Sequence, residues 1–333
     1  MTEKQPLIDG WGRVHSSLRI SVTDRCNIRC FYCMPEENVE FKPRAEILSF
    51  EEITRFVSVA AQLGIRKLRI TGGEPLVRSD LPDLITALTT LPGIDQVAMT
   101  TNGVLLESFA KKLKQAGLQR LNISLDTLDD DKFFQLSRRR GISDVIAGIH
   151  AAEKLGFDKI RLNAIAIRDM TESEIIPLAE FARKFNLELR FIEFMPLDAE
   201  DGWQRSQVLT GDEIKRSLES QFGKLVARPR DDPSQPAVNY SFADGHGSIG
   251  FINPVSQPFC GDCNRLRITA EGQLRNCLFS TSEWDARQLL RHGGSDDDLE
   301  SMIRQCIAAK KPAHGIDSDD FKKPQRAMFQ IGG

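Results

Sequence analysis

The chain has 333 residues, of which 41% are hydrophobic and 27% charged, a balance that is typical of globular proteins and excludes disorder over the whole chain. Its 44 Lys and Arg residues against 47 Asp and Glu residues give a formal net charge of −3, which excludes the general basic field of a nonspecific nucleic-acid binder. The sequence shows no apolar run of membrane-spanning length and no signal peptide, so we expect a cytoplasmic protein without a membrane or nucleic-acid partner.

Strands that alternate with helices are predicted over residues 1–200. Six short strand-like segments lie near residues 18–22, 66–70, 95–100, 119–124, 159–167 and 188–194, and each but the last precedes a helical pattern. This alternation is typical of a parallel α/β sheet, either open or curved into a barrel. Because a seventh and an eighth unit are missing from this stretch, we favour an incomplete (β/α)6 TIM-like barrel.

Helix ends in this region carry capping signals. Two S/T-x-x-E sequences, Ser49 with Glu52 and Thr171 with Glu174, predict capping boxes at helix starts. Three glycines, each between a helical pattern and a strand, predict left-handed helix caps. They are Gly64, Gly117 and Gly156.

Beyond residue 200 the pattern changes. A polar, proline-bearing stretch at 228–237 is followed by short strand-like segments, and Glu271-Gly272 reads as a hairpin turn. An amphipathic helix is expected near 296–310. We therefore predict a smaller C-terminal domain, residues 201–333, with an antiparallel arrangement.

Seven cysteines are an odd number in a chain without an export signal, so metal or redox chemistry is favoured over disulfides. They form two groups of three, with one left over. The first group is Cys26, Cys30 and Cys33, and the second is Cys260, Cys263 and Cys277. The remaining cysteine, Cys306, lies in a helical apolar stripe with Leu299, Met302 and Ile303, which indicates a buried position rather than a ligand.

Each group of three thiolates leaves a coordination position open for a substrate or cofactor, whereas structural zinc prefers four closed ligands. The alternative for the first group is a zinc site that a distant histidine completes. For the second group, His246 is the candidate fourth zinc ligand, although it sits in a glycine-rich turn well before Cys260.

The first group resembles the CxxxCxxC signature of the radical S-adenosylmethionine superfamily, in which an aromatic residue precedes the third cysteine as Tyr32 does here. The segment Thr71-Gly-Gly-Glu-Pro75 resembles that superfamily's GGEP segment, which receives the methionine amino group. Glycines allow close backbone approach there, and Glu74 supplies a carboxylate acceptor. The resemblance implies a 4Fe-4S cluster that binds S-adenosylmethionine and cleaves it to a 5′-deoxyadenosyl radical.

The second cysteine group has the spacing C-x2-C-x13-C, and the segment Arg265-Leu266-Arg267 lies between its second and third cysteines. Together these late motifs resemble those of the GTP 3′,8-cyclase family of molybdenum cofactor biosynthesis. This resemblance runs over nearly the whole chain. It implies a second 4Fe-4S cluster that holds the guanine ring of GTP, removal of the ribose H3′ by the radical, and attack of C3′ on C8. The implied product is (8S)-3′,8-cyclo-7,8-dihydroguanosine 5′-triphosphate.

The resemblance also implies roles for individual residues. The implied contacts to S-adenosylmethionine are Tyr32, Gly73, Ser124 and Met195. The implied GTP contacts are Arg19, Arg69, Thr100, Arg161, Arg265, Leu266 and Arg267. Further cavity residues are Lys67, Glu74, Arg190, Gly332 and Gly333, the last two as a tail that reaches the active site. Arg161 stands where the family usually has lysine. The positive charge is retained, but a planar guanidinium donates hydrogen bonds in a different geometry from a lysine ammonium.

Two other functions stay open at this stage. One is a radical S-adenosylmethionine enzyme that modifies peptides or proteins and uses the late cysteines for an auxiliary cluster. The other is a zinc-stabilised module that binds nucleotides or RNA. The partners implied for the cyclase are an electron donor such as flavodoxin or ferredoxin, the downstream cyclic pyranopterin monophosphate synthase, and a second copy of the chain in a homodimer.

Overall fold

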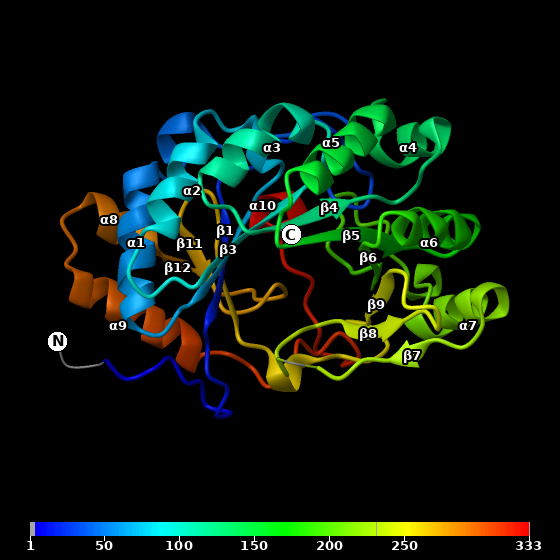
Figure 1. Cartoon of the computed structure of the whole chain (residues 1–333). Coiled ribbons are helices and arrows are strands. Elements are labelled where there is room, and N and C mark those ends of the chain that lie inside the picture. The colour runs from blue at the N-terminus through cyan, green and yellow to red at the C-terminus, as the bar shows by residue number, and fades with distance from the viewer. Residues whose placement is uncertain (1–3, 231, 333) are drawn as a thin grey trace.

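The computed structural model describes residues 4–230 and 232–332. In these residues, twelve strands form one sheet with the order β12-β11-β10-β1-β2-β3-β4-β5-β6-β9-β8-β7 (Figure 1). The first six strands are β1 (Ser17–Ser21), β2 (Lys67–Thr71), β3 (Gln96–Thr101), β4 (Arg120–Ser124), β5 (Lys159–Ala166) and β6 (Glu188–Glu193). The later strands are β7 (Val226–Ala227), β8 (Val238–Ser241), β9 (Ser248–Ile252), β10 (Arg265–Ile268), β11 (Gln273–Arg275) and β12 (Trp284–Asp285).

Helices follow most of the first six strands. They are α1 (Phe50–Gln62), α2 (Leu81–Thr89), α3 (Leu106–Gln115), α4 (Asp130–Ser137), α5 (Ile142–Lys154) and α6 (Ile175–Lys184). The later helices are α7 (Gly211–Phe222), α8 (Ala286–Arg291), α9 (Asp296–Ala308) and α10 (Met328–Ile331). Within the described ranges, no helix combines the length and the apolar character needed to cross a membrane.

Strands β1 to β6 are parallel and lie in chain order, as predicted. The expectation of an antiparallel late region is wrong for β9 and β10. Strand β9 pairs in parallel with β6, and β10 pairs in parallel with β1, so the late strands extend both edges of the same sheet. Antiparallel pairing begins outside them, and the predicted hairpin at Glu271-Gly272 joins β10 to β11. The boundary between domains at residue 200 stays a prediction.

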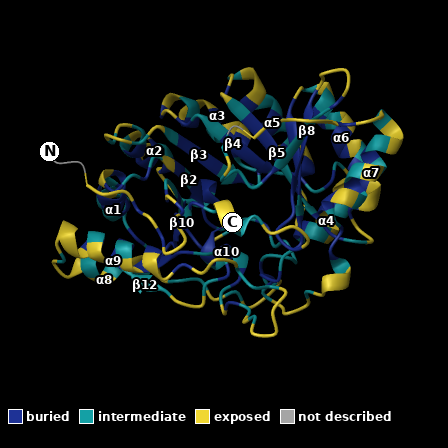
Figure 2. Cartoon of the chain, turned by 90° about the horizontal axis from the view of Figure 1, so that it is seen from below, coloured by how far each residue is buried: buried dark blue, intermediate teal, exposed yellow. Residues whose placement is uncertain are grey.

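The parallel strands divide their side chains between a core and a cavity. Leu18, Ile20, Leu68 and Ile70 are at most 2% exposed and belong to the main hydrophobic core beneath the helices. Because side chains alternate along a strand, the residues between them, such as Arg19, point to the opposite face. Figure 2 shows the result, with buried strands inside helices whose outer faces are exposed.

One of the two predicted capping boxes is confirmed. The Ser49 hydroxyl accepts from the Glu52 N–H at 3.2 Å, and the Ser49 N–H donates to the Glu52 carboxylate at 2.7 Å. The box at Thr171 is wrong, because the Thr171 hydroxyl instead donates to the carbonyl of Ile165 at 3.0 Å. The Glu174 carboxylate accepts from the Thr127 hydroxyl at 2.7 Å, so tertiary partners replace the local cap.

The glycine caps and the late helix also follow the predictions. Gly64, Gly117 and Gly156 have φ angles of 100°, 91° and 65°, in the region that favours glycine. The predicted stripe on α9 is buried, and Cys306 is 0% exposed within it. Cys306 is therefore a core residue.

Candidate active site

A cavity of about 420 Å³ lies on the face of the sheet opposite the helices. Both cysteine groups line it, together with side chains from β1 to β6 and from β10. The predicted cluster and cofactor residues in its wall are Cys26, Cys30, Tyr32, Cys33, Gly73, Ser124, Met195, Cys260, Cys263 and Cys277. The predicted GTP-site residues in its wall are Arg19, Lys67, Arg69, Thr100, Arg161, Arg190, Arg265 and Arg267. Residues that lie more than two hundred positions apart thus share one chamber.

The first cysteine group follows β1, in the loop that leaves the carboxyl end of that strand. The Cys33 N–H donates to the carbonyl of Cys30 at 2.9 Å, which makes a tight turn that brings the three thiols to one side. The Asn102 amide donates to Cys26 Sγ at 3.7 Å. Burial raises the pKa of the Cys26 thiol to about 11 and that of Cys33 to about 12. A metal bound by these thiols would displace their protons, and all three thiols are accessible from the cavity.

The TGGEP turn after β2 packs directly against this loop. The Gly73 N–H donates to the carbonyl of Thr23, and the Glu74 N–H donates to the carbonyl of Arg25, each at 2.8 Å. A Cβ atom at position 73 would lie 2.3 Å from the Arg25 carbonyl oxygen. Only glycine allows this approach, so the turn and the cysteine loop form one wall.

Glu74 is absent from the residues that line the cavity. Its carboxylate is fully buried and accepts hydrogen bonds from the Leu76 N–H, the Thr101 hydroxyl and the Asn102 N–H. These bonds tie the turn after β2 to the turn after β3. Burial raises the pKa of Glu74 to about 7, although the hydrogen bonds act in the opposite direction.

Tyr32 reaches across to β4 and β5. Its hydroxyl donates to one oxygen of Asp126 at 2.6 Å, and the other oxygen accepts from the Ile165 N–H at 2.8 Å. Beside them, Asn163 lines the cavity with a buried side-chain oxygen that has no partner among the described residues. Sequence reasoning missed Asp126 and Asn163, although each stands two residues after a predicted site residue near a strand end.

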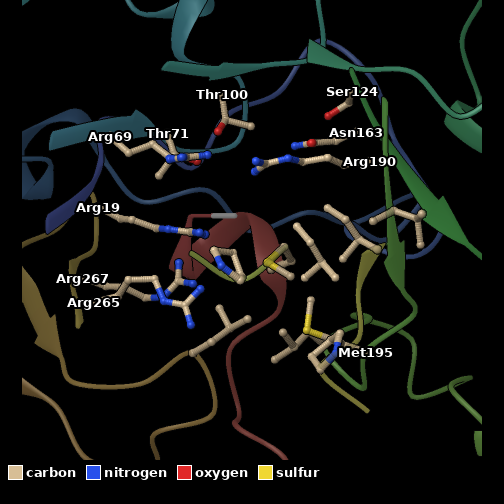
Figure 3. Close-up of a pocket in the computed structure, with 18 of the residues that line it drawn as sticks. Arg19, Arg69, Thr71, Thr100, Ser124, Asn163, Arg190, Met195, Arg265 and Arg267 are labelled. Atoms are coloured by element: carbon tan, nitrogen blue, oxygen red, sulfur yellow. The ribbon is translucent and has the colours of Figure 1, made fainter. Parts of the chain in front are cut away.

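Arginines dominate the rest of the wall. Figure 3 shows Arg19, Arg69, Arg265 and Arg267 on one side of the cavity, with Arg190 reaching in from the opposite side. Within the described chain, neither Arg19 nor Arg69 forms an ion pair with a carboxylate. Burial and the neighbouring guanidinium of Arg265 lower the pKa of Arg19 to about 9, and burial and the surrounding arginines also lower the pKa of Arg69 well below its ordinary value. This uncompensated charge suits a polyanionic ligand.

One buried carboxylate, Glu188, compensates part of this charge. It pairs with Arg161 at 3.1 Å, with Lys159 at 2.7 Å and with Arg190. Burial opposes ionisation of Glu188, but the charges of Arg190 and Arg161 lower its pKa to about 2. Sequence reasoning missed Glu188. The available signal was its position two residues before Arg190, which places both on the same face of β6.

The second cysteine group lies beside β10. Arg265 donates from Nε and Nη2 to Cys263 Sγ, at 3.4 and 3.3 Å. Burial opposes ionisation, but the charges of Arg265 and Lys310 lower the pKa of Cys263 to about 6. His246, the candidate zinc ligand, is exposed and is absent from the cavity wall, whereas His314 lies in that wall.

The thiols do not converge on a single point. Among the described residues, no three His, Cys, Asp or Glu side chains stand where they could hold one metal ion. The ligands of a cubane cluster bind different iron atoms and stand further apart than those of one zinc ion. Two sets of three free thiols that line one cavity therefore fit two clusters.

The structure places the other predicted residues as follows. Lys67 pairs with Asp232 at 2.6 Å, which brings the loop at 232–236 to the cavity. Leu266 is 0% exposed and belongs to the hydrophobic core, so only its backbone is left for a ligand contact. The carbonyl of Gly332 accepts from Arg267 Nη1 at 2.7 Å. A Cβ atom at Gly332 would meet Thr71 Cγ2 at 2.9 Å, and Gly333 lies outside the described residues.

Two family models match the chain. The Radical SAM superfamily matches residues 20–182, and Molybdenum Cofactor Synthesis C matches residues 187–316. The GTP 3′,8-cyclase of Rhodopirellula baltica is 53% identical, over 100% of this chain and 94% of that protein. The GTP 3′,8-cyclase of Syntrophomonas wolfei is 42% identical, over 98% of this chain and 100% of that protein.

Solved structures agree on the fold. Streptococcus suis SuiB bound to S-adenosylmethionine aligns with a TM-score of 0.64 at 16% identity, over 95% of this chain and 77% of that one. The protein anSMEcpe with bound AdoMet aligns with a TM-score of 0.56 at 13% identity, over 93% of each chain. These two similarities establish the fold alone. Because the similarity to the named relatives extends over nearly the full chain at 42% identity or more, the chain belongs to the GTP 3′,8-cyclase family of the radical S-adenosylmethionine superfamily.

Proposed function

We propose that this protein converts GTP to (8S)-3′,8-cyclo-7,8-dihydroguanosine 5′-triphosphate in molybdenum cofactor biosynthesis, as a lyase that forms the C3′–C8 bond. The observation that carries the proposal is a cavity whose wall contains both groups of three thiols and arginines that have no carboxylate partner in the described chain. A nucleoside triphosphate supplies both features that such a wall needs: a base with ligand atoms for iron and a chain of negative phosphates.

This reaction requires iron-sulfur clusters and S-adenosylmethionine. Two 4Fe-4S clusters and S-adenosylmethionine, when bound, supply the 5′-deoxyadenosyl radical that removes H3′ and the iron that holds guanine. We assign Cys26, Cys30 and Cys33 to the first cluster, and Cys260, Cys263 and Cys277 to the second.

The residues at the carboxyl ends of the strands position S-adenosylmethionine. Gly73 keeps the TGGEP backbone against the first cysteine loop, where carbonyl groups can accept from the methionine ammonium. Ser124 and Met195 line the same cavity, and Tyr32 is fixed by its hydrogen bond to Asp126. Asn163 offers its unpartnered oxygen to a hydroxyl or amine of the cofactor.

The arginines bind the triphosphate. Arg19, Arg69 and Arg267 have no competing carboxylate in the described chain, so their guanidinium groups can donate bidentate hydrogen bonds to phosphate oxygens. Arg161 and Arg190 are held by Glu188, which fixes the direction of each fork. Thr100 lines the cavity between these groups and offers a hydroxyl. The Gly332 carbonyl holds Arg267 in place from the tail.

The finer fold and the partners are also proposals. We propose that β1 to β6 form an incomplete (β/α)6 barrel and that residues 201–333 form a smaller domain that carries the second cluster. A flavodoxin or ferredoxin would supply electrons, and cyclic pyranopterin monophosphate synthase would take the product. The protein would act as a homodimer in the cytoplasm.

The proposal is tested by two matched cysteine variants. In anaerobically reconstituted wild type we expect about eight irons with matching sulfide per chain, and GTP-dependent cyclisation. Cys277→Ala should hold about four irons and still cleave S-adenosylmethionine, but lose cyclisation. Cys306→Ala should keep both clusters because Cys306 lies in the core. Stoichiometric zinc without iron, or cyclisation at the normal rate in Cys277→Ala, would contradict the assignment.

A further inference from the structure

Lys310 has no part in the function described so far, yet it is buried beside the second cysteine group. Only 5% of its surface is exposed, and it lies two residues after the end of α9. Its ammonium donates to the carbonyl of Arg265 at 2.9 Å and lies 3.5 Å from Cys263 Sγ. A fully buried lysine is rare unless its charge is compensated.

The segment that carries Lys310 is fixed by a small hairpin, residues 9–14, that precedes β1. The indole N–H of Trp11 donates to the carbonyl of Lys310 at 3.0 Å. Arg13 donates to the carbonyl of Lys311 at 2.7 Å and, from its other terminal nitrogen, to the carbonyl of Cys260 at 2.6 Å. Asp9 holds Arg13 through a buried ion pair of 2.6 Å. The hairpin thus clamps the lysine and the second cysteine loop together.

The groups around Lys310 indicate that the Cys263 sulfur compensates its positive charge. In the described chain no carboxylate lies within ion-pair distance of its ammonium, and its acceptors are a carbonyl and the Cys263 sulfur. Cys263 also accepts two bonds from Arg265. The three cysteines of the group are therefore unequal, because Cys263 alone among them receives hydrogen bonds from two cationic side chains in the described residues.

We propose that Lys310 is a positioning residue that fixes the Cys263 sulfur and raises the reduction potential of the second cluster. The inference rests on the proposed function, which places a cluster on Cys263. A positive charge beside a cluster ligand stabilises the more negative, reduced state, and hydrogen bonds to a ligand sulfur act in the same direction. Removal of the charge should therefore lower the potential.

The test compares Lys310→Gln, Lys310→Arg and Lys311→Gln in anaerobically reconstituted full-length protein. Lys311 is the matched control, because it is the next residue and carries the same charge, but its side chain is exposed. Each protein is titrated with dithionite and redox mediators and followed by electron paramagnetic resonance. The second cluster is identified as the signal that Cys277→Ala lacks. We expect a lower potential for that signal in Lys310→Gln, near wild-type values in Lys310→Arg and Lys311→Gln, and no shift of the first cluster.

An unchanged second-cluster potential in Lys310→Gln would overturn the inference and leave the proposed function intact. If Lys310→Gln cannot hold the second cluster, iron analysis decides: iron retained in Lys310→Arg supports the role of the charge, and iron lost from both variants contradicts it. Wild-type protein with only about four irons would overturn the second cluster itself and, with it, this inference.

Discussion

Glu74 shows how a buried side chain at the rim of the site can be structural. Its carboxylate accepts three hydrogen bonds, from the Leu76 N–H, the Thr101 hydroxyl and the Asn102 N–H, and Asn102 in turn donates to Cys26 Sγ. The acceptor expected for the cofactor is therefore already occupied. Glu74 instead links the turns after β2 and β3 to the first cysteine group.

The raised pKa of Glu74 predicts a pH-dependent stability. Its pKa is about 7 in the folded protein against an ordinary value of 4.5, so above pH 4.5 the folded state keeps a proton that the unfolded chain has released. The contribution of Glu74 to stability is therefore present at low pH and falls as pH rises toward 7. We expect the difference in unfolding free energy between wild type and Glu74→Gln to fall by about 2–3 kcal/mol between about pH 5 and about pH 7.

Denaturant unfolding of both proteins across this range measures that difference. The comparison with the variant is necessary because burial lowers the pKa of His15 to about 4. A buried neutral histidine contributes stability that is lost as pH falls below 6.5, which opposes the trend from Glu74 in the wild type but cancels in the difference. A difference that is constant with pH would show that Glu74 is already ionised at pH 5.

At the scale of elements, the close packing of the TGGEP turn predicts that adding one methyl group at Gly73 destabilises the protein. Gly73→Ala places a Cβ atom 2.3 Å from the Arg25 carbonyl oxygen, and the three nearest atoms that it meets are backbone atoms, which cannot rotate away. We expect a loss of about 3 kcal/mol in unfolding free energy, at the upper end of the cost of overpacking, and weaker binding of S-adenosylmethionine.

Gly10→Ala is the control for this substitution. A Cβ atom there meets no other atom within 4 Å, and its φ angle is not positive. Thermal unfolding of the two variants should show a large decrease for Gly73→Ala and almost none for Gly10→Ala. Equal melting temperatures would mean that the turn can move away from the cysteine loop at little cost.

The elements that could be predicted are those whose sequence pattern lies within a few neighbouring residues. The alternation around Leu18-Arg19-Ile20 predicts β1, and the turn at Glu271-Gly272 predicts the β10–β11 hairpin, because both patterns lie within a few residues. The parallel pairing of β9 with β6 and of β10 with β1 could not be predicted. It depends on register between distant segments, and no local pattern encodes such a register.

The same limit applies to the site. The cysteines and six of the arginines that line the cavity could be predicted because family motifs name them, but Arg120, which also lines it, was missed. Glu188 and Lys310 could not, because their roles come from contacts with Arg161 and Cys263, which lie far away in the sequence. The capping box at Thr171 failed for a related reason, since buried partners from other elements took its hydrogen bonds.

At the scale of the whole molecule, the charge of the cavity differs from the charge of the chain. The net charge is −3, yet seven arginines and one lysine line the cavity, against Asp126, Glu193 and Asp232. Binding of a polyphosphate there should stabilise the fold by mass action, by about 2.7 kcal/mol at a hundredfold excess over its dissociation constant. We expect GTP and inorganic tripolyphosphate to raise the melting temperature, less so at high salt.

Arg267→Gln should lose most of this stabilisation, because the side chain is buried in the cavity wall. Arg216→Gln removes the same charge from the exposed face of α7 and should keep the full effect. Calorimetric titration with tripolyphosphate checks both variants. Equal affinities would place the phosphate site elsewhere in the molecule.

The pairing of β1 with β10 also orders the assembly of the protein in time. On the ribosome, β1 emerges long before β10, so the outer edge of β1 has no neighbour until residues 265–268 are made. An unpaired strand edge readily pairs with other chains, so this edge is exposed to misassembly throughout most of translation. The wall that carries the second cysteine group and the tail that meets Ser21 and Thr71 arrive last. A chain that is cut short before β10 therefore has the first cysteine group and its turn, but never encloses the cavity in which GTP would be held.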